Sequence, residues 1–438
     1  MLAVAVAVVL LAGSRSEADP LEIAGFRLDN GLEVVVISDH RAPVVTQMLW
    51  YRVGSADEEP GKSGLAHLVE HLMFRGVRTG EQVDASTLIK RIGGEENAFT
   101  SHDYTAYHQT VVSNRLDVIM QLEARRMAGL EVPAADLEIE RKVVLEERFV
   151  RVANSDAARF REQVNAATWL AYPYRLPVIG WEHEIRALEL DDVLEFHRRW
   201  YGPDNAVLVL AGDLTEARAR ELARRYYGAI PRRGIAPRSR VREPEQVVPR
   251  RLAMRSPQVG QPSWQRRYIA PGYATGLDDA HALEVLSVVL GGGTTGRLYR
   301  SLVVEQKLAV SAGCWYRGDA LGPTTFGFYA SPSPGVGLDV LEAAVEAEVN
   351  RLLAEGVTAR ERDTAVRRLR RSVILESDTV SGSARIIGAA LVTGRSLEAI
   401  RSWPERVAAV TVDDIRRVAA SVFRLERSVT GELRPSRP

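Results

Sequence analysis

Residues 64–74 are Gly64-Leu65-Ala66-His67-Leu68-Val69-Glu70-His71-Leu72-Met73-Phe74, and this stretch does most to decide the fold and chemistry of the 438-residue chain. On a helix, His67 and His71 lie one turn apart on the same face, with Glu70 beside them. Two imidazoles at that spacing can bind one divalent metal ion while the neighbouring carboxylate transfers a proton. The stretch therefore predicts a helix that carries part of a metal site.

The order His-x-x-Glu-His is the reverse of the commoner His-Glu-x-x-His and is the inverted zincin pattern. We expect its helix to run from about Ser63, as the N-cap, to Arg75 and to end at Gly76. Catalytic zinc usually takes three protein ligands plus water, so a third ligand must come from elsewhere. Cys314 is the only cysteine, which excludes a cysteine-built site and a disulfide within the chain. The motif predicts a zinc peptidase whose remaining ligand is a histidine or a carboxylate.

A second predicted helix, over Ala134–Arg151, offers carboxylates for this site. Glu140 and Glu147 are seven residues apart, which places them about 20° apart on a helical wheel that advances roughly 100° per residue. Both project from one stripe of the helix, whereas Glu146 points toward a different side.

Length and composition set the broad class of the protein. A chain of 438 residues is too long for one compact core and suggests two domains of roughly 200 residues each. Hydrophobic content of 46% and charged content of 26% are typical of a soluble globular protein. The formal net charge is zero, so there is no global electrostatic argument for nucleic acid or anionic lipid as a partner.

The N-terminus begins with an apolar run, Leu2–Gly13, which is too short for the roughly 20 residues that span a bilayer. Its length suits the core of a secretory signal, and Ser16-Glu17-Ala18 offers a small-x-small cleavage site before Asp19. We expect residues 1–18 to be a signal peptide, and the mature protein to be exported, periplasmic and without a stable membrane anchor. The alternative is that the run forms a buried helix.

The order of predicted elements indicates a duplicated unit. Residues 230–249 combine several prolines with few large apolar residues, which marks an extended linker. After it the plan of the first part restarts, with a strand near Ser263–Ile269 and a helix over Asp278–Leu290. We therefore expect an α+β fold with an N-terminal domain at 19–229 and a C-terminal domain at 250–438.

Three tracts carry a specific resemblance: Gly64–Gly76, Gly94-Glu95-Glu96-Asn97-Ala98-Phe99-Thr100, and Glu140–Glu147. They are similar to successive signatures of the pitrilysin–insulysin (insulinase-type) metallopeptidases, above all the short branch that includes the mitochondrial processing peptidase and its bacterial two-subunit relatives. Tyr172–Gly180 and Trp200–Ala206 resemble later family segments, so the likeness covers nearly all of the mature chain. It implies two homologous α/β-roll domains, each an antiparallel-rich sheet flanked by helices.

The resemblance also implies roles for individual residues. His67, His71 and Glu147 would bind one Zn²⁺ per chain, Glu70 would activate the attacking water, and Glu140 would support the site from outside the ligand set. The edge strand that aligns substrate in the family corresponds to four residues: Asn97, Ala98, Phe99 and Thr100. A free strand edge can bind an extended peptide through main-chain hydrogen bonds. The remaining histidines that we considered are interpreted as structural: His102, His108, His183 and His197.

The second half departs from the family pattern. In active family members an arginine and a tyrosine, seven residues apart, follow a glycine turn that resembles Gly291–Tyr299, and they hold the substrate backbone and the oxyanion. Alignment places Val303 and Val310 at these positions, and neither side chain can donate a hydrogen bond. The same turn lacks the Gly-Lys-Ser/Thr ending of a phosphate-binding loop.

This departure leaves three interpretations open. A paired homologous subunit could supply the arginine and tyrosine, which makes this chain the metal-bearing subunit of a heterodimer that hydrolyses peptides or unfolded segments in a closed chamber. The chain could instead work alone, or as a homodimer, with weak activity. From a different class, it could be a non-catalytic assembly or scaffold subunit derived from a peptidase. The intact pentad favours the enzyme, and we expect the heterodimer.

Overall fold

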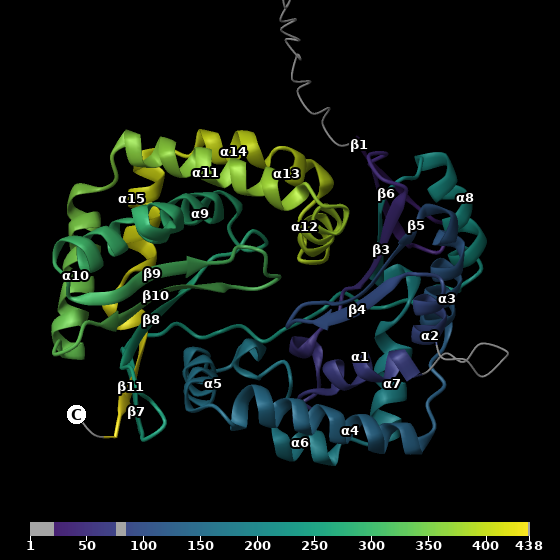
Figure 1. Cartoon of the computed structure of the whole chain (residues 1–438), viewed down its shortest axis with the longest axis horizontal. Coiled ribbons are helices and arrows are strands. Elements are labelled where there is room, and N and C mark those ends of the chain that lie inside the picture. Colours follow the sequence, from purple (N-terminus) through teal and green to yellow (C-terminus); the bar gives the residue numbers. More distant parts are fainter. Residues whose placement is uncertain (1–21, 76–84, 437–438) are drawn as a thin grey trace, which may run out of the picture.

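The computed structural model describes residues 22–75 and 85–436 (Figure 1). The predicted signal peptide at 1–18 and the predicted helix end at Gly76 lie outside the described residues. Each half of the chain is built on one sheet with helices packed against it (Figure 1). In the described ranges, no helix combines the length and the apolar character needed to cross a membrane.

The N-terminal half contains a six-stranded sheet in the order β1-β2-β6-β3-β5-β4. Only the β2–β6 pair is parallel. Strand β4 pairs with β5 alone, so it forms one edge of the sheet. The strands are β1 (Glu22–Arg27), β2 (Glu33–Ser38), β3 (Val44–Tyr51), β4 (Glu95–Thr100), β5 (Thr105–Val112) and β6 (Ala206–Gly212).

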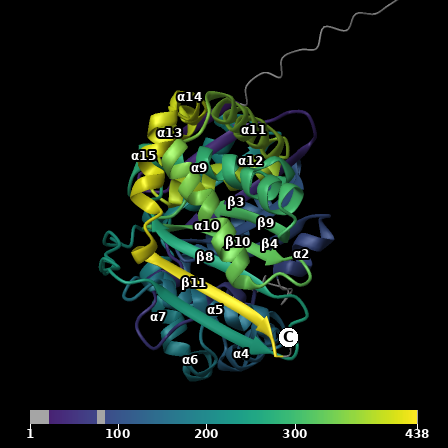
Figure 2. The same ribbon diagram turned by 90° about the vertical axis from the view of Figure 1, so that its left-hand side faces the viewer.

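The C-terminal half contains a five-stranded sheet in the order β7-β11-β8-β10-β9. Its single parallel pair, β7–β11, lies side by side in Figure 2 and corresponds to β2–β6 of the first sheet. By the same correspondence β9 is the edge strand equivalent to β4. The strands are β7 (Arg250–Ser256), β8 (Ser263–Ala270), β9 (Ala309–Tyr316), β10 (Thr324–Pro332) and β11 (Ser428–Pro435). The predicted α+β class with two antiparallel-rich, homologous units is confirmed.

Helices follow the strands in each half. The first half contains α1 (Leu65–Arg75), α2 (Ala85–Arg91), α3 (Leu116–Ala128), α4 (Ala134–Arg148), α5 (Asp156–Thr168), α6 (Glu182–Ala187), α7 (Leu190–Trp200) and α8 (Glu216–Tyr227). The second half contains α9 (Leu277–Gly291), α10 (Leu338–Glu355), α11 (Ala359–Ser377), α12 (Val380–Val392), α13 (Leu397–Arg401), α14 (Trp403–Ala409) and α15 (Val412–Val422). A π-helical turn at Phe149–Ala153 follows α4, and a π-helical segment at Tyr299–Glu305 precedes β9.

Each sheet and its helices enclose a separate apolar core. In the first half, Leu68 and Leu72 of α1, Ile119 of α3 and Leu222 of α8 are almost fully buried together. In the second half the core contains Leu286 of α9, Val345 of α10 and Val418 of α15, among others. Burial of one such side chain contributes roughly 1.5–3 kcal/mol, so each core can stabilise its own half.

The two halves exchange one helix each. Helix α12, from the second half, packs Ala384, Ile387 and Leu391 against β3 and β6 of the first sheet. Helix α5, from the first half, packs Phe160 and Val164 against the β7–β11 side of the second sheet. Both helices lie between the two sheets in Figure 1. This exchange fixes how the halves face each other.

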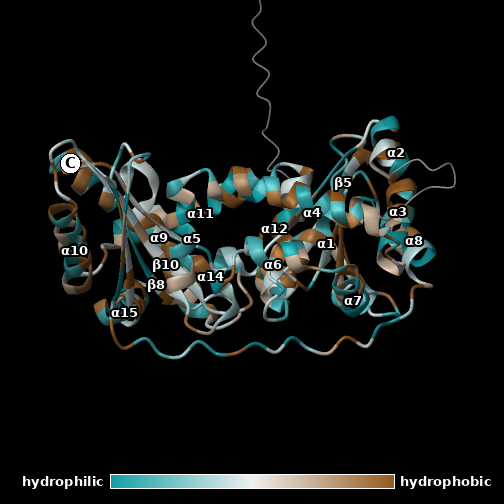
Figure 3. Cartoon of the chain, turned by 90° about the horizontal axis from the view of Figure 1, so that it is seen from below, coloured by the Kyte–Doolittle hydropathy of each residue, from teal (hydrophilic) through white to brown (hydrophobic). Residues whose placement is uncertain are grey.

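Residues 231–249 contain no helix or strand and run between the halves as an extended segment along the lower edge of Figure 3. The segment is anchored along its length. Arg240 pairs with Asp57 and Asp103 of the first half, and Arg238 donates to the carbonyl of Val392 at the end of α12. Asp103 also accepts the backbone N–H of Leu321, from the second half. The segment therefore ties both halves together.

Candidate active site

Helix α1 is held rigidly at its N-terminus. The N-terminal N–H groups of a helix have no partner within the helix, and here Glu58 accepts those of Gly64 and Ala66 at 3.1 and 2.8 Å. Gly64 has a φ of +89°, and a Cβ there would come within 2.7 Å of the Ile179 carbonyl oxygen. The sequence prediction that Ser63 is the N-cap is wrong, because its hydroxyl accepts the backbone N–H of Trp181 instead.

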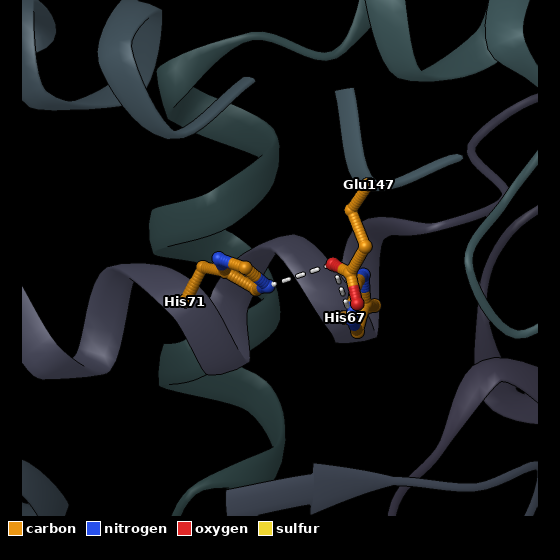
Figure 4. A group of neighbouring side chains, drawn as sticks. All are labelled: His67, His71 and Glu147. Carbon is orange, nitrogen blue, oxygen red and sulfur yellow. Dashed lines mark ion pairs between the residues drawn. The ribbon is translucent and has the colours of Figure 1, made fainter. Parts of the chain in front are cut away.

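Three predicted ligands converge in the structure, on α1 and the last turn of α4. Oε2 of Glu147 lies 3.6 Å from Nε2 of His67 and 3.4 Å from Nε2 of His71 (Figure 4). One ligand atom from each of the three residues lies within 4.8 Å of the others. Within residues 22–75 and 85–436, this is the only group of three or more such side chains with metal-ligand spacing.

The two separations from Oε2 of Glu147 fit a zinc ion. Tetrahedral ligands at about 2.0–2.1 Å from zinc are about 3.4 Å from one another, close to the two distances from Glu147 Oε2. This oxygen is buried and has no hydrogen-bond partner among the described residues. A buried carboxylate oxygen without a partner is costly, and a cation between it and the two imidazoles would remove that cost.

A second carboxylate orients one imidazole. Nδ1 of His71 lies 3.1 Å from Oε2 of Glu140, whose other oxygen accepts a 2.8 Å hydrogen bond from Nε of Arg75. A proton on Nδ1 leaves the lone pair of Nε2 available to a metal, which is how carboxylates commonly support zinc-binding histidines. By contrast, Nδ1 of His67 has no hydrogen-bond partner in the described part of the chain.

Electrostatics differ between the two histidines. Burial lowers the pKa of His67 to about 4, and the charge of His71 acts in the same direction. Burial would also lower the pKa of His71, but its contacts with Glu140 and Glu147 outweigh it and raise the pKa to about 9. The His71 imidazole, 3.4 Å from Oε2, also lowers the pKa of Glu147, which keeps this ligand ionised.

Glu70 lies on the same helix beside the ligands and beside the edge strand. Burial raises its pKa, although the 2.5 Å hydrogen bond from the hydroxyl of Thr100 acts in the opposite direction. A general base gains strength as its pKa rises toward the working pH. Thr100 therefore links the candidate base to β4.

These groups line one cavity of about 750 Å³. It includes all nine residues that the sequence nominated: His67, Glu70, His71, Asn97, Ala98, Phe99, Thr100, Glu140 and Glu147. Four of these residues belong to β4, whose second edge pairs with no strand of the described chain. The histidines assigned to structural roles lie outside the cavity, and Glu146 is exposed.

Sequence reasoning missed several residues of the cavity. Arg75 and Arg151 hold the outer oxygens of Glu140 and Glu147 at 2.8 Å each. The spacing of four residues from Glu147 to Arg151 on one helix could have revealed the second pair. Val178 and Ile179 also line the cavity, and no local pattern brings their loop to α1.

Fold and site together define a two-domain α+β protein with an inverted zincin pentad, and comparison with known proteins gives the family. Residues 33–181 match the model of the insulinase family (peptidase family M16), and residues 187–369 match that of the peptidase M16 inactive domain. The chain belongs to the insulinase family, M16, which confirms the resemblance found in the sequence.

Individual relatives support this placement. The zinc protease PqqE of Helicobacter pylori is 28% identical over 412 residues, which cover 93% of this chain and 92% of the relative. A crystal structure of a protease from the same organism, 27% identical, superposes with a TM-score of 0.86 and covers 95% of this chain and 100% of that one. The periplasmic protease PqqL of Escherichia coli, 18% identical, has a TM-score of 0.79 over 94% of this chain but only 48% of its own.

Proposed function

We propose that this protein is a zinc-dependent endopeptidase that hydrolyses peptides or unfolded segments inside a closed chamber, as the metal-bearing subunit of a heterodimer. The observation that carries the proposal is the convergence of His67, His71 and Glu147 next to Glu70, in a cavity whose wall includes a free strand edge. The zinc proteases among its relatives support both the reaction and the metal.

Each residue of the site has a distinct task in this proposal. His67, His71 and Glu147 hold Zn²⁺, which when bound supplies Lewis-acid polarisation and lowers the pKa of water. Glu70 accepts the proton of the attacking water and returns it to the leaving amine, while Thr100 fixes the direction of its carboxylate. Glu140 fixes the ring orientation of His71.

Substrate would bind as an added strand. The backbone of Asn97–Thr100 can hydrogen-bond an extended peptide and place its carbonyl near the metal ligands. Main-chain recognition favours extended chains, which explains why peptides and unfolded segments are the proposed substrates.

A paired subunit would complete the active site. Val303 packs against the core of the second half, and Val310, on β9, is 51% exposed, so neither position offers a donor to substrate. A homologous partner with the arginine and tyrosine would supply this function. This chain matches only 48% of PqqL, so at least one protein of the same fold has a chain about twice as long.

Export to the periplasm is part of the proposal. It rests on the apolar run Leu2–Gly13 and the small-residue site before Asp19. Mass spectrometry of the mature N-terminus tests it, and a chain that retains residues 1–18 in an exported fraction would contradict cleavage.

The first experiment tests the enzyme. Metal analysis of freshly purified protein should find about one zinc per chain. A quenched-peptide assay of Glu70→Gln, purified together with any partner, should show a loss of about 10²–10⁴-fold, because proton transfer is lost. Zinc content should be unchanged in this variant, since Glu70 is not among the converging ligands. Full activity of Glu70→Gln would refute the mechanism.

The second experiment tests the pairing. The chain purified alone should turn over slowly, and addition of a homologous subunit with the arginine and tyrosine should restore the rate. Full turnover by the isolated chain would exclude the heterodimer.

The scaffold remains the alternative from another class, and it is favoured by one observation, the absence of both donor side chains in the second half. Freshly purified protein without zinc, with or without a partner, would support the scaffold over the enzyme.

A further inference from the structure

Within the part of the chain that the structure describes, Arg151 is the one arginine that forms an ion pair with a predicted metal ligand. Helix α4 ends at Arg148, short of the predicted end at Arg151, and continues as a π-helical turn over Phe149–Ala153. Such turns are frequent at functional sites. Here the turn keeps Arg151 on the side of Glu147, at the rim of the cavity.

The two oxygens of Glu147 are divided between different neighbours. Oε1 lies 2.8 Å from a guanidinium nitrogen of Arg151. Oε2 is buried, has no hydrogen-bond partner among the described residues, and faces both Nε2 atoms. A carboxylate held in this way presents one oxygen to an ion and cannot rotate freely.

We propose that Arg151 is a positioning residue that fixes Glu147 as a one-oxygen metal ligand. The inference rests on the metal site of the proposed function and adds a residue to it. Arg75 makes the equivalent contact with Oε1 of Glu140, so Glu140 and Glu147 each have an arginine on the outer oxygen and a histidine on the inner one. The arginines balance the charge that the two carboxylates bring into the cavity.

An ordinary surface ion pair would look different. Arg186 and Glu182 form such a pair at the same i, i+4 spacing, at 2.7 Å, with side chains 60% and 56% exposed. Exposed pairs of this kind are worth about 0.3–0.5 kcal/mol. The Arg151 side chain is itself 69% exposed, but Glu147 is only 19% exposed, and its inner oxygen faces two imidazoles rather than water. Loss of Arg151 should therefore be felt at the metal site more than in overall stability.

The test measures metal binding directly. Metal-free protein, reloaded with zinc in competition with a chromophoric chelator, gives the zinc dissociation constant of each variant. Arg151→Gln should bind zinc about 10–100-fold more weakly, the usual cost of removing a partner that orients a ligand. Arg151→Lys keeps the positive charge but lacks the planar guanidinium group. Its zinc affinity should therefore lie between that of Arg151→Gln and that of the unmodified chain. Arg186→Gln, the matched control, should bind as the unmodified chain does.

Cobalt substitution adds a spectroscopic readout. The visible absorption of Co²⁺ at the site should change in Arg151→Gln, because Glu147 is free to rotate, and should recover in part in Arg151→Lys. Unchanged affinity and unchanged cobalt spectra in Arg151→Gln would overturn the proposal. If Arg151→Gln fails to fold, the lysine variant decides, and affinity equal to the unmodified chain would overturn it.

Failure of this inference and failure of the proposed function have different signatures. An unmodified chain that binds zinc but cleaves no peptide refutes the proposed activity and leaves the role of Arg151 measurable. An unmodified chain that binds no zinc refutes both. If the unmodified chain cleaves peptide normally, and Arg151→Gln binds zinc as tightly as the unmodified chain, the inference alone is refuted.

Discussion

Helices α1 and α9 occupy equivalent positions in the two halves and are used differently. Each follows the strand at the same place in its sheet order, β3 or β8, and packs against the edge strand, β4 or β9. Each carries a histidine three residues before a glutamate, His67 and Glu70 in α1 and His281 and Glu284 in α9. Burial raises the pKa of both glutamates, and a hydroxyl group donates to each.

The difference lies in the surroundings of these residues. In α9 the next residue is Val285, not a second histidine, and Glu284 accepts hydrogen bonds from the Tyr273 hydroxyl and, at 2.9 Å, from Nε1 of Trp403. In α1 the ligand atoms of His71 and its partners face a cavity. A helix at this position thus becomes a site only where a second histidine, a ligand from α4 and open space coincide. In α9, where these features are missing, the same residue types pack within the core of the second half.

Histidine substitutions should separate the two helices most strongly. We expect His67→Ala to lose nearly all of its zinc and peptidase activity, because one of three protein ligands is removed. His281→Ala should keep about one zinc per chain, since within the described ranges this side chain donates only to the carbonyl of Leu277. Metal analysis after dialysis against zinc-free buffer checks both. Equal zinc loss in the two variants would show that α9 also contributes to metal binding.

The second prediction concerns substitutions that place hydrogen-bond donors at the aligned positions of the second half. Val303→Arg with Val310→Tyr should raise the activity of the isolated chain by up to about 10²-fold, since one oxyanion donor is worth about 10²–10³ in turnover. Steady-state cleavage of a quenched peptide measures the gain.

Val304→Arg is the control for this experiment, because Val304 is 55% exposed on the same π turn but is not aligned with the family pair. Val303 is partly buried, so Val310→Tyr is also tested alone. A double variant that folds and shows no gain would mean that the missing pair does not limit the rate.

Features that depend on residues close together in the chain could be predicted from the sequence, whereas features that depend on distant residues could not. The metal helix and the stripe of Glu140 and Glu147 follow from local periodicity, whereas the edge strand was expected from the resemblance to the family. The exchange of α5 and α12 was not predicted, because it is fixed by contacts between residues far apart in the chain. The cap of α1 was missed for a related reason: Glu58 reaches the helix from a separate turn.

The third prediction concerns the core of the second half. Glu284→Ala should lower the free energy of unfolding by about 1–3 kcal/mol, because the buried Tyr273 hydroxyl loses its acceptor and Nε1 of Trp403 keeps only the Tyr273 oxygen as a partner. Zinc content should not change. Chemical denaturation of the metal-free protein measures the loss, and Glu398→Ala, at an exposed position of α13, should stay within about 0.5 kcal/mol of the unmodified chain.

The smallest expected effect is a dependence of stability on pH that arises from Glu284 itself. Burial raises the pKa of this carboxyl above 4.5 in the folded state, even though Tyr273 and Trp403 lower it, so the folded protein binds the proton more tightly than the unfolded chain. The stabilisation is present below pH 4.5 and is lost as the pH rises through the folded pKa, at about 1.4 kcal/mol for each pH unit that separates the folded and unfolded pKa values. The side chain in Glu284→Gln stays neutral at every pH. The free energy of unfolding of this variant should therefore increase relative to that of the unmodified chain as the pH rises above 4.5. A difference that is constant with pH would mean that Glu284 is ionised in the core, and that the two helices differ in charge as well as in surroundings.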